Sequence, residues 1–172
     1  MPVLNADQIL RRSEILRRKV SPCVLCPRQC RALRLKGEKG FCGITDAAVL
    51  SHCLPHFGEE PPISGGSGSG TVFLSGCNAA CLFCQNYQIS RLRTGRAVSV
   101  QDLAEAFLKL QDQGCVNINW VTPAPHLPFL VEALALADAC GLKLPVVYNT
   151  NGYDRVEILR LLSGVVDVYL PD

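Results

Sequence analysis

From residue 71 onward the chain alternates short apolar runs with amphipathic segments, the pattern of a sheet whose strands are joined by helices. The apolar runs predict strands at 71–76, 116–122, 144–149 and 165–170. Helical spacing predicts helices at about 100–112, 127–140 and 154–163. Ser99 is a suitable cap for the first helix, and Gly141 is a typical end for the second. Such repeats fold as a parallel sheet with right-handed crossovers, so we expect an α/β chain with about four parallel strands.

In parallel sheets, functional side chains gather just beyond the carboxyl ends of the strands. Here those ends are Cys77–Cys84, Thr122–His126, Asn149–Tyr153 and Pro171–Asp172. The first contains three cysteines, Cys77, Cys81 and Cys84, spaced C-x3-C-x2-C. A loop this short can place three thiolates on three irons of an iron–sulfur cube, which leaves the fourth iron open to a substrate or cofactor.

The chain has 10 cysteines, and seven of them fall in two tight clusters. Short clustered spacings favour metal binding over disulfides. The second cluster consists of Cys23, Cys26, Cys30 and Cys42, a set that suits either a zinc site or a second iron–sulfur cluster. The nearby cations Arg28, Arg31, Arg34, Lys36 and Lys39 would offset the negative charge of a thiolate-bound metal. We expect the other three cysteines, Cys53, Cys115 and Cys140, to be buried as small apolar residues.

Composition excludes several classes of protein. The 48% hydrophobic and 19% charged residues of the 172-residue chain describe a globular core. A net charge of +2 gives no strong attraction to nucleic acid or membrane, and we interpret the arginines at 11, 12, 17 and 18 as a solvated helix face rather than a nucleic-acid contact. No apolar run is long enough for a membrane span and no secretory signal is evident, so we expect a cytoplasmic protein.

The first 70 residues predict a separate, cysteine-rich cap, with residues 71–172 forming the sheet domain. A helix is expected at 6–18, with Asn5 as its cap and Gln8 completing a capping box. Residues 52–70 are rich in loop-forming residues, and 64–70 have the composition of a flexible linker. This segment also offers His52 and His56 as candidate ligands and Glu59 with Glu60 as a candidate acid/base pair, although such residues more often satisfy local backbone groups.

Several stretches together resemble one known superfamily. The C-x3-C-x2-C loop directly after a first strand, with the aromatic Phe83 before its third cysteine, resembles the radical S-adenosylmethionine superfamily. Four further stretches resemble the subgroup related to pyruvate formate-lyase activating enzyme. They are Cys84-Gln-Asn-Tyr, His56-Phe-Gly-Glu-Glu-Pro-Pro-Ile-Ser-Gly, Tyr148-Asn-Thr-Asn-Gly-Tyr153 and Tyr169-Leu-Pro-Asp172. The resemblance implies a partial (β/α) barrel of the radical S-adenosylmethionine type.

The resemblance also implies an activity. Cys77, Cys81 and Cys84 would hold a [4Fe–4S] cluster, and the reduced cluster would cleave S-adenosylmethionine to a 5′-deoxyadenosyl radical that abstracts hydrogen from a protein or peptide. An electron donor such as flavodoxin or ferredoxin would reduce the cluster. The expected contacts to S-adenosylmethionine are Phe83, Thr122, Asn149, Asn151 and Asp172. The protein would supply binding, orientation and exclusion of solvent.

The sequence departs from the family pattern in two places. Activating enzymes carry Gly-Gly-Glu after the second strand, where this chain reads Thr122-Pro-Ala-Pro-His126. Thr122 or backbone carbonyls would replace the acid, and His126 either contacts cofactor or substrate or is structural. The family barrel has about six strands, so the sequence predicts either that the C-terminal part is missing or that a second copy of the chain completes the sheet. The alternative function is therefore a catalytically incompetent iron–sulfur or zinc-binding module.

Overall fold

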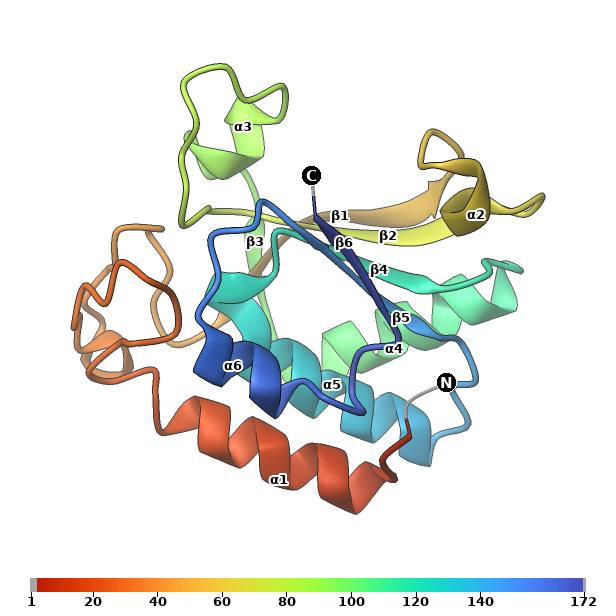
Figure 1. Cartoon of the computed structure of the whole chain (residues 1–172), viewed down its shortest axis with the longest axis horizontal. Coiled ribbons are helices and arrows are strands. Elements are labelled where there is room, and N and C mark those ends of the chain that lie inside the picture. The colour runs from red at the N-terminus through yellow and green to blue at the C-terminus, as the bar shows by residue number, and fades with distance from the viewer. Residues whose placement is uncertain (1–2, 172) are drawn as a thin grey trace.

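A computed structural model describes residues 3–171 as one six-stranded sheet with helices packed against it (Figure 1). The strands are β1 Ala48–His56, β2 Ser69–Leu74, β3 Arg96–Val98, β4 Ile118–Val121, β5 Val146–Thr150 and β6 Val168–Pro171. The helices are α1 Ala6–Arg17, α2 Pro61–Ser64, α3 Tyr87–Ser90, α4 Val100–Asp112, α5 Leu127–Ala139 and α6 Val156–Leu161. Two 3₁₀ turns, η1 Arg34–Lys36 and η2 Ala124–His126, complete the elements. The strand order is β3-β1-β2-β4-β5-β6.

The parallel part of the sheet confirms the expected α/β fold. β2, β4, β5 and β6 run parallel in sequence order, with Val72 opposite Trp120 and Trp120 opposite Tyr148. The central strands β2, β4 and β5 are largely buried, which is why they appear in the sequence as continuous apolar runs, whereas β6 at the edge of the sheet is mostly exposed. The observed strands are shifted by a few residues from their predicted bounds, because pairing with neighbours decides where a strand begins and ends. Four parallel strands were predicted, and four are present.

Two antiparallel strands extend the sheet beyond β2 and were not predicted. β1 pairs with β2 and carries β3 on its other edge. The expectation of a flexible linker at 64–70 is wrong, because α2 ends at Ser64, and Ser69 and Gly70 are buried and begin β2. Ser69 Oγ donates to Asn117 Oδ1 over 2.7 Å, which ties this segment to β4. The sheet therefore crosses the division at residue 70 that composition suggested.

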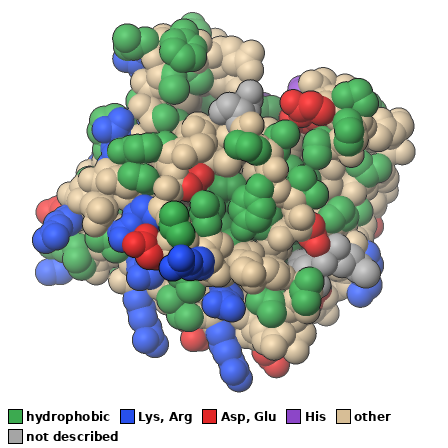
Figure 2. Space-filling model, viewed as in Figure 1, with side chains coloured by type: hydrophobic (Ala, Val, Ile, Leu, Met, Phe, Trp, Pro, Cys, Tyr) green, Lys and Arg blue, Asp and Glu red, His purple; other side chains and the backbone are tan. Residues whose placement is uncertain are grey.

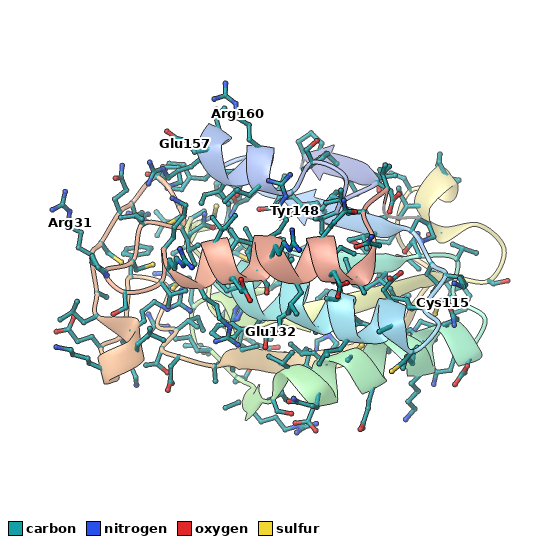
Figure 3. The ribbon with its side chains drawn as sticks, turned by 90° about the horizontal axis from the view of Figure 1, so that it is seen from below. Arg31, Cys115, Glu132, Tyr148, Glu157 and Arg160 are labelled. Carbon is teal, nitrogen blue, oxygen red and sulfur yellow. The ribbon has the colours of Figure 1, made fainter. Side chains whose placement is uncertain are left out.

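The helices α1, α4 and α5 lie together on one side of the sheet, with α5 between α1 and the strands (Figure 1). Nearly every position of α5 is buried, which fits its apolar composition on all sides. Arg17 of α1 pairs with Glu132 of α5 at 2.6 Å, and Glu132 is labelled in Figure 3. The N-terminal helix is thus part of the main core rather than a separate cap element.

Side-chain caps begin two of the helices as the sequence predicts. Asn5 and Gln8 form a capping box at α1, with both hydrogen bonds at 3.0 Å. Ser99 caps α4, where Asp102 completes a second box, again with both bonds at 3.0 Å. Across residues 3–171, no helix has the length and apolarity needed to cross a membrane.

The cysteines outside the two clusters differ in burial. Cys115 is buried at the end of the molecule remote from the cysteine-rich loop (Figure 3), as expected. Cys53 is half-buried, and burial raises the pKa of its thiol to about 12. The expectation for Cys140 is wrong, because it follows the last residue of α5 and is exposed.

Candidate metal centre and its surroundings

The three-cysteine loop leaves the carboxyl end of β2, the position that the sequence predicts. Gly76 has φ +84°, and a Cβ atom there would lie 2.5 Å from the carbonyl oxygen of Cys42, so only glycine fits at this turn. Ala80, inside the loop, also has a left-handed backbone with φ +55°. Cys77, Cys81 and Cys84 are each partly exposed. Their thiols are therefore reachable from solvent at the end of the sheet where parallel strands present functional groups.

Polar hydrogens point at two of the three thiols. The backbone N–H of Ala79 donates to Cys77 Sγ over 3.3 Å, and the Asn151 amide lies 3.5 Å from the same sulfur. Ser90 Oγ donates to Cys84 Sγ over 3.3 Å. Donors of this kind stabilise thiolates and tune the potential of iron–sulfur clusters. The surroundings of this loop thus provide hydrogen-bond donors to two of its sulfur atoms.

Asn78, next to Cys77, joins three segments and was not recognised in the sequence. Its Nδ2 donates to the Tyr153 carbonyl over 2.7 Å, and its Oδ1 accepts from Asn151 over 3.0 Å. Its own carbonyl accepts a hydrogen bond from Arg28 in the cysteine-rich loop. Asn78 is buried, so these contacts hold the start of the three-cysteine loop against the end of β5. A single asparagine between two cysteines carries no sequence signal for such a role.

Those predicted S-adenosylmethionine contacts that the structure describes lie at the same end of the sheet as the cysteine loop, but their surroundings differ from one another. Among the described contacts outside the cysteine loop, Asn151 is the one whose side chain hydrogen-bonds to residues of that loop. Thr122, with φ +50°, follows β4, and its N–H donates to the carbonyl of Asn149 over 2.8 Å, so these two positions adjoin. Phe83 is 92% exposed in the segment of residues 80–92 around α3, which we call the α3 lobe, together with the exposed Leu82, Tyr87 and Leu92. Figure 2 shows hydrophobic side chains on this part of the surface. Asp172 lies outside the described residues.

His126 occupies a structural position. Its side chain is 0% exposed, and its Nε2 lies 2.9 Å from the carbonyl oxygen of Ser75, just before the cysteine loop. Burial lowers the pKa of His126 to about 3, with a smaller opposite effect from the Ser75 carbonyl and a further lowering by the charge of Arg34. The neutral ring therefore donates from Nε2 and supports the end of β2, while its Nδ1 has no partner.

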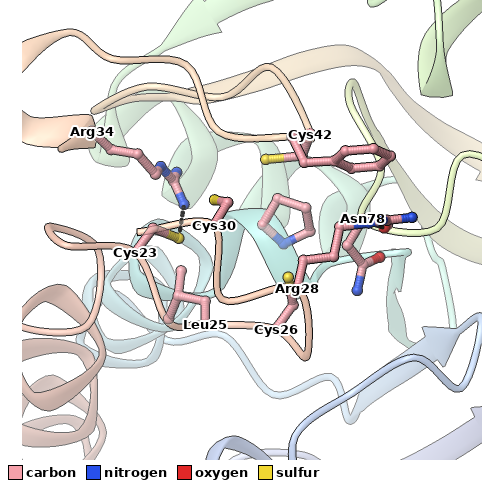
Figure 4. A pocket seen from close by; sticks show the side chains of 10 residues that line it. Cys23, Leu25, Cys26, Arg28, Cys30, Arg34, Cys42 and Asn78 are labelled. Carbon is pink, nitrogen blue, oxygen red and sulfur yellow. Dashed lines mark hydrogen bonds between the residues drawn. The ribbon is translucent and has the colours of Figure 1, made fainter. Parts of the chain in front are cut away.

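The second cluster also comes together in space. Cys23, Cys26, Cys30 and Cys42 line one small pocket, whose wall includes Arg28, Arg34 and Asn78 (Figure 4). A Cβ atom at Gly40 would lie 3.2 Å from Cys30 Sγ and 3.6 Å from Cys42 Sγ, so the backbone passes close to both thiols. Arg31 points away from this pocket at the rim of the molecule (Figure 3). Of the cations expected to offset a metal's charge, Arg28 and Arg34 are the two that line the pocket.

The thiols of this pocket influence one another. Burial raises the pKa of Cys26, and the neighbouring Cys23 and Cys30 raise it further against a hydrogen bond from the backbone of Arg28. Burial also raises the pKa of Cys42, and Arg34 opposes that shift. At Cys30 burial acts in the same direction, but hydrogen bonds from the backbone at Ala32 and Phe41 outweigh it and the pKa is lowered. Proton loss from Cys26, Cys30 and Cys42 is thus linked to neighbouring groups of the pocket.

The donor chemistry of both clusters fits a thiophilic metal. Thiols are the only metal-binding side chains in the cap pocket and in the Cys77–Cys84 loop. Thiolates are the preferred ligands of zinc and of iron–sulfur clusters. Between residues 3 and 171, no three Cys, His, Asp or Glu side chains are already arranged around a single-ion position. The two clusters therefore fit a metal by donor type and shared location.

The candidates in the 52–60 segment lie elsewhere. His56 pairs with Ser69, the first residue of β2, at the end of the sheet opposite Cys77. His56 Nδ1 lies 3.3 Å from Glu59 Oε1, and His52 stacks on Phe73 with ring centroids 4.3 Å apart. Glu60 precedes α2 without capping it through its side chain. None of these four residues adjoins either cysteine cluster.

Comparison with known proteins agrees with this arrangement. The sequence model of the Radical SAM superfamily matches residues 71–171, more than half of the chain. The chain belongs to the radical S-adenosylmethionine superfamily. Members of this superfamily bind a [4Fe–4S] cluster and S-adenosylmethionine.

Two relatives from Methanocaldococcus jannaschii are similar to it. The uncharacterized protein MJ0674 is 34% identical over 168 residues, covering 92% of this chain and 47% of the relative. The uncharacterized protein MJ0808 is 26% identical over 157 residues, covering 81% of this chain and 46% of the relative. The chain thus spans about half the length of these relatives. No solved structure matches it.

Proposed function

We propose that Cys77, Cys81 and Cys84 hold a [4Fe–4S] cluster with one open iron, and that the protein uses it to cleave S-adenosylmethionine reductively. When bound and reduced, that cluster and cofactor supply a 5′-deoxyadenosyl radical for hydrogen abstraction. The observation that carries the proposal is the contact between the segments that follow β2 and β5, which brings the Asn151 amide within 3.5 Å of Cys77 Sγ. Donors to sulfur around a solvent-reachable three-thiol loop suit an anionic cluster with an open site.

The chain's own residues would bind and orient S-adenosylmethionine. Thr122 and Asn149 adjoin at the ends of β4 and β5, where a polar cofactor would find hydroxyl and amide groups. Phe83 offers an exposed ring beside Cys84 for the adenine. Asn151 and Asp172 complete the proposed contacts. In place of the acid that activating enzymes carry after the second strand, Thr122 or backbone carbonyls of this turn would accept the cofactor's amino group.

The substrate that we propose is a protein or peptide, by resemblance to the subgroup of pyruvate formate-lyase activating enzyme. The partially exposed cysteine loop would also accept an electron from a donor such as flavodoxin or ferredoxin in the cytoplasm. For the pocket of Cys23, Cys26, Cys30 and Cys42 we propose a second metal centre, either zinc or an iron–sulfur cluster. Four thiols and no evident open position suit a closed site of a structural or electron-carrying kind.

The test is the anaerobic reconstitution of the wild type with iron and sulfide, followed by reduction with dithionite in the presence of S-adenosylmethionine. We expect 5′-deoxyadenosine to form with the wild type and not with Cys81→Ala. The exposed Cys140→Ala variant, which leaves both clusters intact, is the matched control. Cluster binding without 5′-deoxyadenosine would instead favour a metal-binding module without this activity. Absence of iron from the wild type would overturn the proposal at its first step.

A further inference from the structure

The two cysteine clusters share a wall. Asn78, the neighbour of Cys77, lines the pocket of Cys23, Cys26, Cys30 and Cys42 (Figure 4). The turn at Gly76 lies so close to Cys42 that a Cβ atom would come within 2.5 Å of its carbonyl oxygen. The loop that carries the second cluster therefore packs directly on the backbone that carries the first.

Arg28 joins the two loops. It lies between Cys26 and Cys30, and its Nε donates to the Asn78 carbonyl over 2.5 Å while Nη2 donates to the Ala79 carbonyl over 3.2 Å. Both acceptors are in the short stretch between Cys77 and Cys81. The planar guanidinium matches two adjacent carbonyls better than a lysine ammonium would. One side chain of the cap thus holds two backbone groups of the three-cysteine loop.

Aromatic rings hold the Arg28 guanidinium in place. Its central carbon lies 3.4 Å from the centroid of Phe41 and 5.7 Å from that of Tyr153. Phe41 precedes Cys42, and Tyr153 accepts the Asn78 amide through its carbonyl. Such cation–π contacts contribute more when the cation is removed from water. The orientation of Arg28 therefore depends on the folding of the loop that carries Cys26, Cys30 and Cys42.

Two other arginines fasten the same cap loop to the sheet domain. Arg155, before α6, donates from Nη1 to the Val24 carbonyl over 2.8 Å. Arg93, which follows the α3 lobe, donates from Nη2 to the Phe41 carbonyl over 3.3 Å. Both arginines belong to segments that follow the three-cysteine loop in the chain. With Arg28, they attach the cap loop to the sheet domain at three places.

A buried charge indicates that the cap pocket holds an anionic centre. Arg34 is 0% exposed, and its Nη1 lies 3.8 Å from Cys23 Sγ while its Nε donates to the Thr45 carbonyl over 2.7 Å. Its Nη2 is buried without a hydrogen-bond partner, and among residues 3–171 no carboxylate forms an ion pair with it. A buried cation is costly unless it is paired. Four thiolates around a metal would supply the missing negative charge.

We propose that the four-cysteine pocket binds a tetrathiolate metal centre whose task is to position the Cys77–Cys84 loop, with Arg28 as the positioning residue between them. The inference rests on the proposed function in one respect, namely that the Cys77–Cys84 loop holds a cluster. Metal binding orders the cap loop, the ordered cap directs Arg28, and Arg28 fixes the backbone between Cys77 and Cys81. Because coupling of two binding sites is reciprocal, each metal is held more tightly when the other is present.

The first measurement identifies the cap metal. The triple variant Cys77→Ala, Cys81→Ala, Cys84→Ala retains only one cysteine cluster, the one in the cap. After anaerobic reconstitution with zinc, iron and sulfide, any metal or sulfide that it binds therefore belongs to the cap. One zinc per chain assigns a zinc site, and iron with sulfide assigns a second cluster, and either result supports the proposal. A variant that is folded and binds neither overturns it.

The second measurement tests the coupling through Arg28. We would compare Arg28→Gln with Arg31→Gln, which removes an arginine from the same loop whose side chain points away from the pocket (Figure 3). The readout is the rate at which reconstituted protein releases iron to a chelator, after subtraction of any iron that the triple variant assigns to the cap. We expect release from Arg28→Gln to be about tenfold faster, the size of effect typical of residues that orient metal ligands, and release from Arg31→Gln to equal the wild type.

Further variants separate the possible failures. Cys26→Ser, which disables the cap, should reproduce the fast release of Arg28→Gln, and Arg28→Lys should lie between that variant and the wild type. If Arg28→Gln does not fold, the same comparison is made with Arg28→Lys and Cys26→Ser. Equal release rates in the wild type, Cys26→Ser and Arg28→Lys would overturn the coupling while leaving the proposed function intact. A wild type that holds no iron at Cys77, Cys81 and Cys84 would mark failure of the proposed function instead.

Discussion

The side-chain amide of Asn151 lies 3.5 Å from Cys77 Sγ, so a residue at the end of β5 donates toward a sulfur at the end of β2. We predict that Asn151→Ala lowers the reduction potential of the reconstituted cluster, because loss of a donor to sulfur disfavours the more negative reduced state. A hydrogen bond contributing about 1 kcal/mol corresponds to roughly 40 mV for one electron. A redox titration followed by electron paramagnetic resonance measures the shift.

Gln88→Ala is the control for this prediction. Gln88 is an exposed residue of the nearby α3 lobe, and its side chain makes no hydrogen bond in the described structure. Its removal should leave the potential unchanged. An unshifted or raised potential in Asn151→Ala would show that its amide does not bond to the bound sulfur.

Because His126 is buried, we expect the folded protein to lose stability in mild acid. Because its pKa is depressed to about 3, the folded protein holds a neutral ring where the unfolded chain takes up a proton below about pH 6.5. The unfolded state then binds more protons, so stability is full above that pH and falls as the pH decreases toward 3. Arg34 is the charged group that acts on the ring, and it keeps its charge throughout this range.

We expect His126 to account for a loss of about 2 kcal/mol in unfolding free energy between pH 7.5 and pH 5. Urea unfolding of the wild type and of His126→Gln at both values measures it. The glutamine amide can replace Nε2 as a donor to Ser75 but does not titrate, so the variant should lose less stability on acidification by that amount. Equal losses in the two proteins would contradict the assignment.

Asp154 accepts hydrogen bonds from two hydroxyl groups at the end of β5. Tyr148 donates to its Oδ1 over 2.9 Å, and Thr150 donates to its Oδ2. Burial, and then the nearby charge of Asp154, raise the pKa of Tyr148 well above its ordinary value, so the phenol remains a donor. Asp154→Ala should destabilise the fold by about 2–3 kcal/mol, because it leaves the buried hydroxyls of Tyr148 and Thr150 without their acceptor.

Urea unfolding at neutral pH checks this prediction, with Glu157→Ala as the control. Glu157 is exposed and, within the described residues, pairs with Arg155 at 3.2 Å, so its loss should leave the unfolding free energy nearly unchanged. Similar small effects for both variants would mean that Asp154 is replaced by solvent at no cost.

We expect a smaller effect on the unfolding free energy from the loss of the Ser99 cap at the start of α4. Its hydroxyl accepts from the Asp102 N–H at 3.0 Å while Asp102 accepts from the Ser99 N–H. Ser99→Ala should lower the unfolding free energy by about 1 kcal/mol, the usual contribution of an N-cap. Glu105→Ala, on the exposed face of the same helix, should change it little, and chemical denaturation of the pair decides whether the cap acts as described.

Local pattern was enough to predict the parallel strands and the main helices. Apolar runs such as 71–76 are long and continuous because central parallel strands are covered on both faces. The capping boxes at Asn5 and Ser99 could be predicted because their partners are three residues away. The strands β1 and β3 could not, since β1 carries Pro55 and alternating polar residues, and its pairing with β2 depends on a partner that local sequence does not specify.

The sequence by itself determined which side chains could supply metal ligands, because the spacing of Cys77, Cys81 and Cys84 and of the four cap cysteines predicts two clusters of thiols. The tertiary structure alone decided how the clusters relate to each other. Arg28, Asn78 and Asn151 are far apart in the chain, and each is an ordinary polar residue in its local sequence. Their hydrogen bonds form only when the cap loop and the segments after β2 and β5 come together, and those long-range contacts join the two cysteine motifs into one structure.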